Sequence, residues 1–242
     1  MGYSIQTGLL VLVNAAHPIP DRRPGSAMAP ALPGSEVLMD ARAAAMLTGL
    51  VSRLDAAGQI VAVSGWRSER EQRAIWDGSM LENGADFTRK YVAAPGCSEH
   101  QTGLAIDLAL NSGSIDFIRP EFPYDGVCGR FRELAADYGF IERYKAGKEH
   151  VTGIAAEPWH FRYVGRPHAR LMCELGLCLE EYVELLRSYP YPDRLLESRE
   201  EHYEARVGFT GSAEALSAAD APCQLSGNNV DGYICTLWRK PA

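Results

Sequence analysis

The fold of this chain is decided by the stretch SEHQTGLAID, residues 98–107. Between His100 and Asp107 it carries Gly103, a residue type that readily adopts the positive φ of a tight turn. The apolar residues after Gly103 favour a strand over residues 105–110 that carries Asp107. A turn followed by a strand would bring Asp107 back beside His100. Since imidazole nitrogen and carboxylate oxygen both bind zinc well, this stretch predicts two ligands of a metal site.

A third ligand is predicted from the stretch EPWH, residues 157–160. A catalytic zinc takes three protein ligands and leaves a fourth position to water, so His160 would complete the set. Glu157, three residues before His160, offers a carboxylate that can take a proton from that water, an effect worth about 10²- to 10⁴-fold in rate. Spacing alone leaves a second interpretation open. The same three ligand residues would also suit structural or solvated positions, because each short pattern arises by chance in many chains.

The elements around these stretches favour an α+β fold. Ser68 and Glu71 have the spacing of a capping box and predict the start of a helix. Hydrophobic periodicity and turn residues predict helices over residues 40–59, 68–81, 131–138, 167–175 and 179–188. Strands are expected over residues 8–14, 60–64, 105–110 and 158–164, with an irregular segment over residues 18–39. Helices and strands do not alternate strictly, which favours α+β over α/β.

The character of the chain changes near residue 190. The sequence YPYP at residues 189–192 interrupts it, and residues 197–204 are strongly charged. Residues 222–226 and 233–237 then predict two strands around a Gly/Asn/Asp-rich turn, which is typical of a hairpin. We therefore expect one large domain over residues 1–190, followed by a charged linker and a small hairpin appendage over residues 191–242.

Composition limits the classes of partner and the compartment. The net charge of −7 comes from 24 basic and 31 acidic residues, so there is no basic excess to neutralise phosphates, and we expect no nucleic acid partner. No stretch approaches the roughly 18–20 apolar residues that span a membrane, and no membrane anchor is expected. The six cysteines include no C-x-x-C pair. We expect them to be reduced thiols in the cytoplasm, because the chain starts without a signal-peptide pattern.

Together these motifs resemble the zinc D-alanyl-D-alanine carboxypeptidase and dipeptidase family (VanY/VanXY type, peptidase family M15). That family carries S-x-H-x-x-G-x-A-x-D followed by E-x-x-H, which residues 98–107 and 157–160 match. Residues 64–68, SGWRS, are similar to a third element, and residues 139–149 to the segment before the catalytic glutamate. The resemblance covers roughly residues 8–170. It implies a small antiparallel sheet flanked by helices, as in hedgehog proteins and D,D-peptidases.

The resemblance also implies roles for individual residues. It implies one Zn²⁺ ion and a small peptide substrate with a free C-terminal carboxylate. At the matching positions the family has three zinc ligands, a catalytic base, and groups that contact the substrate carboxylate or the developing oxyanion. The implied zinc ligands are His100, Asp107 and His160, the implied base is Glu157, and the implied substrate contacts are Arg67, Gln72 and Ser98. Arg67 would both bind the substrate and assist catalysis.

The resemblance implies hydrolysis of the peptide bond that precedes a C-terminal D-alanine. The substrates would be D-Ala-D-Ala or cytoplasmic pentapeptide precursors of peptidoglycan. Removing the terminal D-alanine from them would deplete the target of vancomycin and so give resistance. Four alternatives stay open: an unanchored carboxypeptidase for recycled peptides, an L,D-carboxypeptidase, a cell-wall endopeptidase, and a non-catalytic zinc-binding module of the same fold. A homodimer is expected from the family alone.

Overall fold

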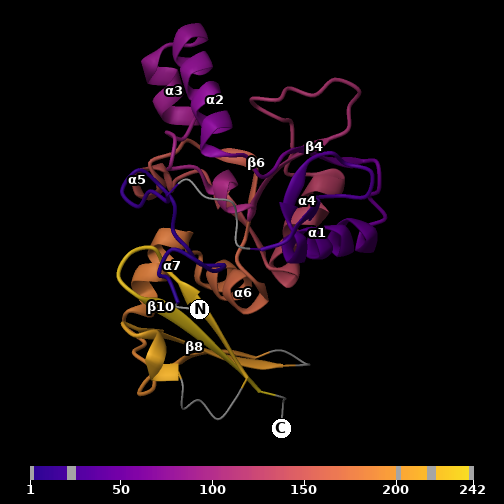
Figure 1. Cartoon of the computed structure of the whole chain (residues 1–242). Coiled ribbons are helices and arrows are strands. Elements are labelled where there is room, and N and C mark those ends of the chain that lie inside the picture. Colours follow the sequence, from indigo (N-terminus) through magenta and orange to yellow (C-terminus); the bar gives the residue numbers. More distant parts are fainter. Residues whose placement is uncertain (1–2, 21–25, 200–202, 217–221, 240–242) are drawn as a thin grey trace. The chain divides into compact units, whose positions relative to one another are not determined.

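The computed structural model describes residues 3–20, 26–199, 203–216 and 222–239 (Figure 1). It divides into two compact units: one comprises Val13–Ala169, and the other combines Met1–Leu12 with Arg170–Ala242. The mixture of antiparallel sheets and helices confirms the predicted α+β class. The assignment of residues 1–190 to a catalytic domain stays a prediction, since compactness does not test where catalytic function ends.

The larger unit is built on a four-stranded antiparallel sheet with the strand order β3-β4-β6-β5. The strands are β3 Ile60–Ser64, β4 Ala105–Leu110, β5 Phe140–Tyr144 and β6 Glu157–Tyr163. Strands β3, β4 and β6 confirm the sequence prediction. Strand β5 was not predicted, because Glu142 and Arg143 break the apolar alternation that normally identifies a strand.

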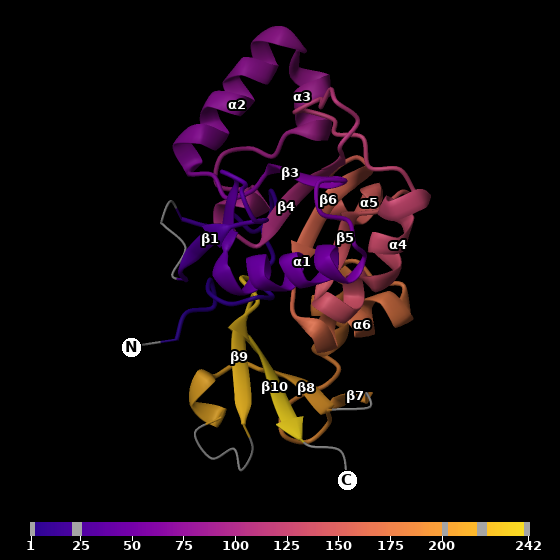
Figure 2. The same ribbon diagram turned by 90° about the vertical axis from the view of Figure 1, so that its right-hand side faces the viewer.

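Helices and short turns surround this sheet. The larger unit contains helices α1 Ala41–Arg53, α2 Glu69–Glu82, α3 Ala85–Tyr91, α4 Gly126–Ala135 and α5 Glu149–Thr152, with 3₁₀ turns η1 Glu99–Thr102 and η2 Ala136–Tyr138. The segment predicted to be irregular contains a two-stranded ribbon, β1 Met28–Pro30 with β2 Leu38–Asp40. Helices α1 and α4 lie side by side against the sheet (Figure 2). Among the described residues, no helix has the length and apolar character needed to cross a bilayer.

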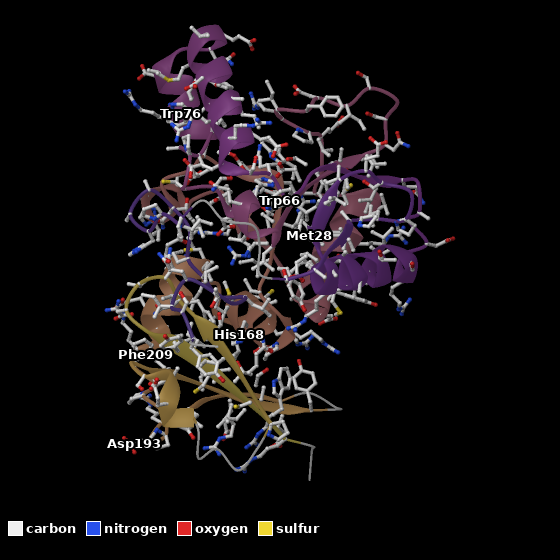
Figure 3. The ribbon with its side chains drawn as sticks, in the orientation of Figure 1. Met28, Trp66, Trp76, His168, Asp193 and Phe209 are labelled. Atoms are coloured by element: carbon white, nitrogen blue, oxygen red, sulfur yellow. The ribbon has the colours of Figure 1, made fainter. Side chains whose placement is uncertain are left out.

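Helix α2 begins where the sequence predicts it. The Ser68 hydroxyl accepts a hydrogen bond from the Glu71 backbone N–H at 3.3 Å, and the Glu71 carboxylate accepts one from the Ser68 N–H at 2.7 Å. This reciprocal pair satisfies two backbone donors that the first helical turn would otherwise leave open. Figure 3 labels Trp66 just before this helix and Trp76 within it. The capping box therefore fixes the direction in which the chain leaves β3, immediately after Arg67.

Helix α1 is shorter than predicted. The Asp40 carboxylate caps it by accepting hydrogen bonds from the backbone N–H groups of Arg42 and Ala43. The helix ends at Arg53, whereas the periodic pattern extended the prediction to residue 59. Asp55 adopts a φ of 51°, a left-handed conformation that terminates a helix. The apolar pattern has its last member at Leu54, and the prediction extended five residues too far beyond it.

An aromatic cluster anchors β6 in the core of the larger unit. The rings of Phe122, Phe131 and Phe161 pack edge to face, with centroid separations of 4.9–5.5 Å. Phe131 and Phe161 are fully buried. Edge-to-face pairs of this kind stabilise by about 0.5–1.5 kcal/mol beyond area burial. The cluster therefore holds one side of β6 firmly while the other side carries polar residues.

A glycine at the entrance to β5 provides a test of this packing. Gly139 has a φ of 83°, and a Cβ there would lie 2.7 Å from Tyr163 Cε2 and 3.0 Å from Gly165 Cα. Gly139→Ala combines a left-handed penalty of about 1–2 kcal/mol with overpacking of about 1–3 kcal/mol. We expect it to lower the free energy of unfolding, measured with urea, by about 2–5 kcal/mol.

The matched control is Gly153→Ala. Gly153 has a similar φ of 72°, but nothing lies within 4 Å of the position that a Cβ would take there. The free energy of unfolding of Gly153→Ala should fall only by the cost of a left-handed conformation, about 1–2 kcal/mol. Equal losses for the two variants would contradict the steric argument at Gly139.

The smaller unit contains a second four-stranded antiparallel sheet with the order β7-β8-β10-β9. Its strands are β7 Leu196–Arg199, β8 Glu204–Thr210, β9 Cys223–Gly227 and β10 Tyr233–Arg239. The predicted hairpin is confirmed as β9 paired with β10. The prediction of a charged linker is corrected, because its ends form β7 and the start of β8. Glu197 and Arg199 are exposed and Glu204 and Arg206 are half-buried, while the alternate residues Ser198, Ala205 and Val207 are buried.

Helices α6 Arg166–Leu175 and α7 Leu179–Leu186 agree with the two predicted helices. A short 3₁₀ turn, η3 Ala213–Leu216, follows β8. The predicted strand over residues 8–14 is wrong as an element, although its apolar side chains are buried. The Leu10 N–H donates to Ser226 Oγ at 2.9 Å and the Leu12 N–H to the Asn228 carbonyl at 3.1 Å. The segment thus bonds to a β9 side chain and to the residue that follows β9, and it does not extend a sheet ladder.

Candidate metal centre

Three predicted ligands converge at one end of the larger unit's sheet. His100 lies in η1, Asp107 in β4 and His160 in β6. Asp107 and His160 are direct cross-strand partners in the antiparallel pairing of β4 with β6. His100 Nε2 lies 3.2 Å from Asp107 Oδ2, and His160 Nδ1 lies 3.0 Å from Asp107 Oδ1. One ligand atom from each residue lies within 4.8 Å of the others.

The turn that carries His100 has the form predicted for it. Gly103 adopts a φ of 75°, and its N–H donates to the His100 carbonyl at 3.1 Å. The His100 ring is oriented by its other nitrogen, since Nδ1 lies 2.7 Å from the Gly65 carbonyl oxygen and donates to it. That bond places the proton on Nδ1 and leaves the Nε2 lone pair facing Asp107.

The position of Glu157 depends on an irregularity in β6. In a regular strand, residues three apart point to opposite faces of the sheet. Here β5 and β6 slip in register: Glu142 pairs with Phe161, whereas Tyr144 pairs with Glu157. The additional residues on β6 bend the strand, as a bulge does. In this irregular part of β6, Glu157 and His160 share one side, with Glu157 Oε2 at 3.5 Å from His160 Nδ1.

Burial sets the protonation of two of these groups. Burial lowers the pKa of His100 to about 4, so its imidazole is neutral and available as a ligand near neutral pH. Burial also raises the pKa of the Glu157 carboxyl to about 8. A carboxyl group with a pKa close to working pH is suited to accept and return a proton.

The donor set fits zinc. Asp107 Oδ1 is buried without a hydrogen-bond partner among the described residues, and it lies 3.0 Å from His160 Nδ1. Two imidazoles and one carboxylate are ligands that zinc prefers, at about 2.0–2.2 Å each. Three ligand atoms at that radius would lie a few ångströms apart, as the three measured here do. The set leaves a fourth position for water or substrate.

The three ligands and Glu157 open into a cavity of about 360 Å³ within the larger unit. Arg67, Gln72 and Ser98 also line it, so the structure brings all seven predicted site residues together. Arg67 Nε and Gln72 Oε1 are buried without a hydrogen-bond partner among the described residues. Gln72 is held in place by its amide nitrogen, which donates to the Ala93 carbonyl at 2.6 Å. The cavity wall therefore offers an unmet donor and an unmet acceptor to a ligand.

Sequence reasoning missed some residues at this centre. Tyr144 lines the cavity, and its ring centroid lies 4.9 Å from that of His160. Glu99, Arg143 and Arg162 are buried behind His160. Glu99 lies within residues 98–107, but only its neighbour His100 was interpreted as a functional residue there. Arg143 and Tyr144 lie in a segment that resembled the family without any single residue standing out.

The family model described as VanY, D-alanyl-D-alanine carboxypeptidase, matches residues 36–166. This chain belongs to that family. The bifunctional D-Ala-D-Ala dipeptidase and D-Ala-D-Ala carboxypeptidase VanXYC of Enterococcus gallinarum is 40% identical over 180 residues, which cover 73% of this chain and 94% of the relative.

Solved structures agree with this membership. The vancomycin resistance D,D-dipeptidase VanXYg, in complex with a D-Ala-D-Ala phosphinate analogue, matches with a TM-score of 0.90 and 45% identity, covering 97% of this chain and 95% of that chain. The L,D-carboxypeptidase LdcB matches with a TM-score of 0.62 and 33% identity, covering 73% of this chain and 86% of that chain. A D,D-pentapeptidase VanY variant in complex with Zn(II) matches with a TM-score of 0.59 and 31% identity, covering 72% of this chain and 98% of that chain. His100, Asp107 and His160 are therefore a zinc-binding triad in a zinc peptidase family.

Proposed function

We propose that this chain hydrolyses the peptide bond that precedes a C-terminal D-alanine, both in D-Ala-D-Ala and in pentapeptide precursors of peptidoglycan. The observation that carries the proposal is the match to the D,D-dipeptidase VanXYg over 97% of this chain. The bifunctional relative from Enterococcus gallinarum supports activity on both substrate lengths. A cavity of about 360 Å³ is of a size suited to a small peptide.

Three cavity residues would bind the substrate. Arg67 follows β3 and precedes the N-terminus of α2, and its buried Nε lacks a described partner. A guanidinium binds a carboxylate in a bidentate way, so Arg67 suits the free C-terminal carboxylate or the developing oxyanion. Ser98 contributes a hydroxyl group to the same wall. Gln72, with its amide nitrogen already bonded, presents an oxygen that would accept from a substrate N–H.

Glu157 would move the proton in the reaction. Zinc, when bound, supplies Lewis acidity that makes a water molecule nucleophilic near neutral pH. Glu157 takes a proton from the attacking water as the new C–O bond forms at the scissile carbonyl. The same carboxyl group then returns the proton to the leaving amine of D-alanine as the C–N bond breaks. The distance of 3.5 Å between Glu157 Oε2 and His160 Nδ1 supports this role, because a general base must lie within reach of the water that it activates.

The purified zinc-loaded protein should release D-alanine from D-Ala-D-Ala and from a pentapeptide that ends in D-Ala-D-Ala. An L,D-tetrapeptide, offered at equal concentration, should release little or none. Amino-acid analysis of the products measures all three reactions. Cleavage of the tetrapeptide alone would refute the D,D assignment and favour an L,D-carboxypeptidase, an activity carried by LdcB. No cleavage of any peptide would favour a zinc-binding module.

Two further features of the proposal come from the sequence and stay predictions. We place the enzyme in the cytoplasm, where removal of D-Ala-D-Ala termini from precursors would give resistance to vancomycin. We also expect a homodimer from family membership. Cell fractionation and light scattering would measure these two properties.

A further inference from the structure

A group of three charged side chains is buried directly behind His160. Glu99 comes from η1, Arg143 from β5 and Arg162 from β6. Arg143 Nε and Arg162 Nη1 both lie 2.8 Å from the same oxygen, Glu99 Oε1. None of the three side chains has any solvent-exposed surface. We call these residues the Glu99 cluster.

Stability alone gives a poor reason for this arrangement. Removing three charges from water carries a desolvation penalty that their mutual attraction often fails to repay. Apolar replacements of buried ion-pair groups are frequently neutral or stabilising. Both arginines contact Oε1 of Glu99, so the second carboxylate oxygen, Oε2, is available for another role.

The unused oxygen of Glu99 faces the metal centre. Glu99 Oε2 lies 3.7 Å from His160 Nε2, and both atoms are buried without a hydrogen-bond partner among the described residues. The other ring nitrogen, His160 Nδ1, lies 3.0 Å from Asp107 Oδ1 and 3.5 Å from Glu157 Oε2. The ring therefore has one nitrogen in the ligand set and the other toward Glu99. To ligate zinc through Nδ1, His160 must carry its proton on Nε2.

We propose that Glu99 is a positioning residue that holds His160 in the zinc-binding orientation and tautomer. Its Oε2 accepts a hydrogen bond from the His160 Nε2–H, and Arg143 and Arg162 hold the carboxylate by occupying Oε1. Shortening the distance of 3.7 Å between Glu99 Oε2 and His160 Nε2 by less than 1 Å would give a normal hydrogen-bond length. The inference requires the zinc triad but is independent of the proposed substrate, because its effect is on metal binding.

The two histidine ligands are thereby held by different partners. His100 donates to a neutral carbonyl group, that of Gly65. His160 faces a carboxylate, which raises the basicity of the ligand more than a carbonyl does. Loss of such an outer partner typically weakens metal binding by about 10- to 100-fold.

The variant Glu99→Gln tests this role while preserving size and shape. The two arginines are donors and would keep the amide oxygen as their acceptor, so the amide –NH₂ would face His160 Nε2. A donor at that position favours the tautomer with the proton on Nδ1, which opposes zinc binding. In competition with a chromophoric chelator, the variant should show a zinc dissociation constant about 10- to 100-fold larger than that of the wild type.

The matched control is Glu142→Gln. Glu142 lies on β5 and, like Glu99, is largely buried and accepts from an arginine, Arg132 Nε, at 2.8 Å, but it is not among the residues that line the metal-site cavity. Its zinc affinity should stay within about threefold of the wild type. Unchanged zinc affinity in folded Glu99→Gln would overturn the proposal, as would equal losses in the two variants. Thermal melting of the metal-free proteins establishes folding.

A measurement on the wild type keeps the proposal testable if Glu99→Gln does not fold. Long-range ¹H–¹⁵N correlation spectra of the zinc-loaded protein assign the state of each imidazole nitrogen. We expect His160 to carry its proton on Nε2 and to bind metal through Nδ1. Metal on Nε2, with the proton on Nδ1, would overturn the proposal. Neither experiment uses a peptide substrate, so a failure of the proposed D,D activity would leave both results interpretable.

Discussion

Replacing Glu157 by Gln is expected to lower kcat for D-Ala-D-Ala by about 10²- to 10⁴-fold, the usual contribution of a general base. The amide has nearly the same shape but cannot take a proton from water. Zinc should remain bound, because His100, Asp107 and His160 provide the ligands and Glu157 is an additional group 3.5 Å from His160 Nδ1. Steady-state kinetics together with atomic absorption on the same sample measure both properties. Glu157→Ala should behave in the same way.

The control for this prediction is again Glu142→Gln, since Glu142 lies on the neighbouring strand and outside the cavity lining. It should retain near wild-type kcat. A zinc-loaded Glu157→Gln enzyme that keeps more than about a tenth of wild-type kcat would be incompatible with a general-base role of the usual size. Activity that survives complete removal of the metal by a chelator would contradict the whole mechanism.

Replacing His100 by Ala is expected to abolish activity by a different route, through loss of the metal. His100 supplies one of three protein ligands, and its Nδ1 bond to the Gly65 carbonyl preorients the ring. Removing a direct ligand should weaken zinc binding by more than the roughly 10- to 100-fold that loss of an outer partner costs. Zinc content after dialysis should fall from one ion per chain to nearly none, with turnover falling in parallel.

His150→Ala serves as the matched control, because His150 is exposed and is not part of the triad. It should retain one zinc ion and full activity. Stoichiometric zinc in folded His100→Ala would contradict the assignment of His100 as a ligand. The contrast between the Glu157 and His100 variants separates catalysis from metal binding, since only the His100 variant should lose zinc.

Local signals allowed much of the fold to be predicted. The capping box of Ser68 and Glu71 placed the start of α2, and the apolar run after Gly103 placed β4. Errors arose where tertiary contacts override local patterns. Within residues 8–14 the apolar residues 10–13 are buried, but their backbone bonds to the Ser226 hydroxyl of β9 and to the Asn228 carbonyl, and it forms no strand. The charged segment after residue 196 forms strands, because its charged residues alternate with residues that pack inward.

The sequence by itself determined the metal ligands through the ordered match of its motifs to the family, because side-chain chemistry and spacing alone left a structural interpretation of His100, Asp107 and His160 open. Only the tertiary structure decided how they meet. Asp107 and His160 are cross-strand partners through a pairing between strands some fifty residues apart in the chain, which local propensity does not specify. Glu157 and His160, three apart, would point to opposite faces of a regular strand. In the irregular part of β6 beside the register slip the two side chains instead share one side, 3.5 Å apart, and packing of β5 against β6 also brings the Glu99 cluster behind His160.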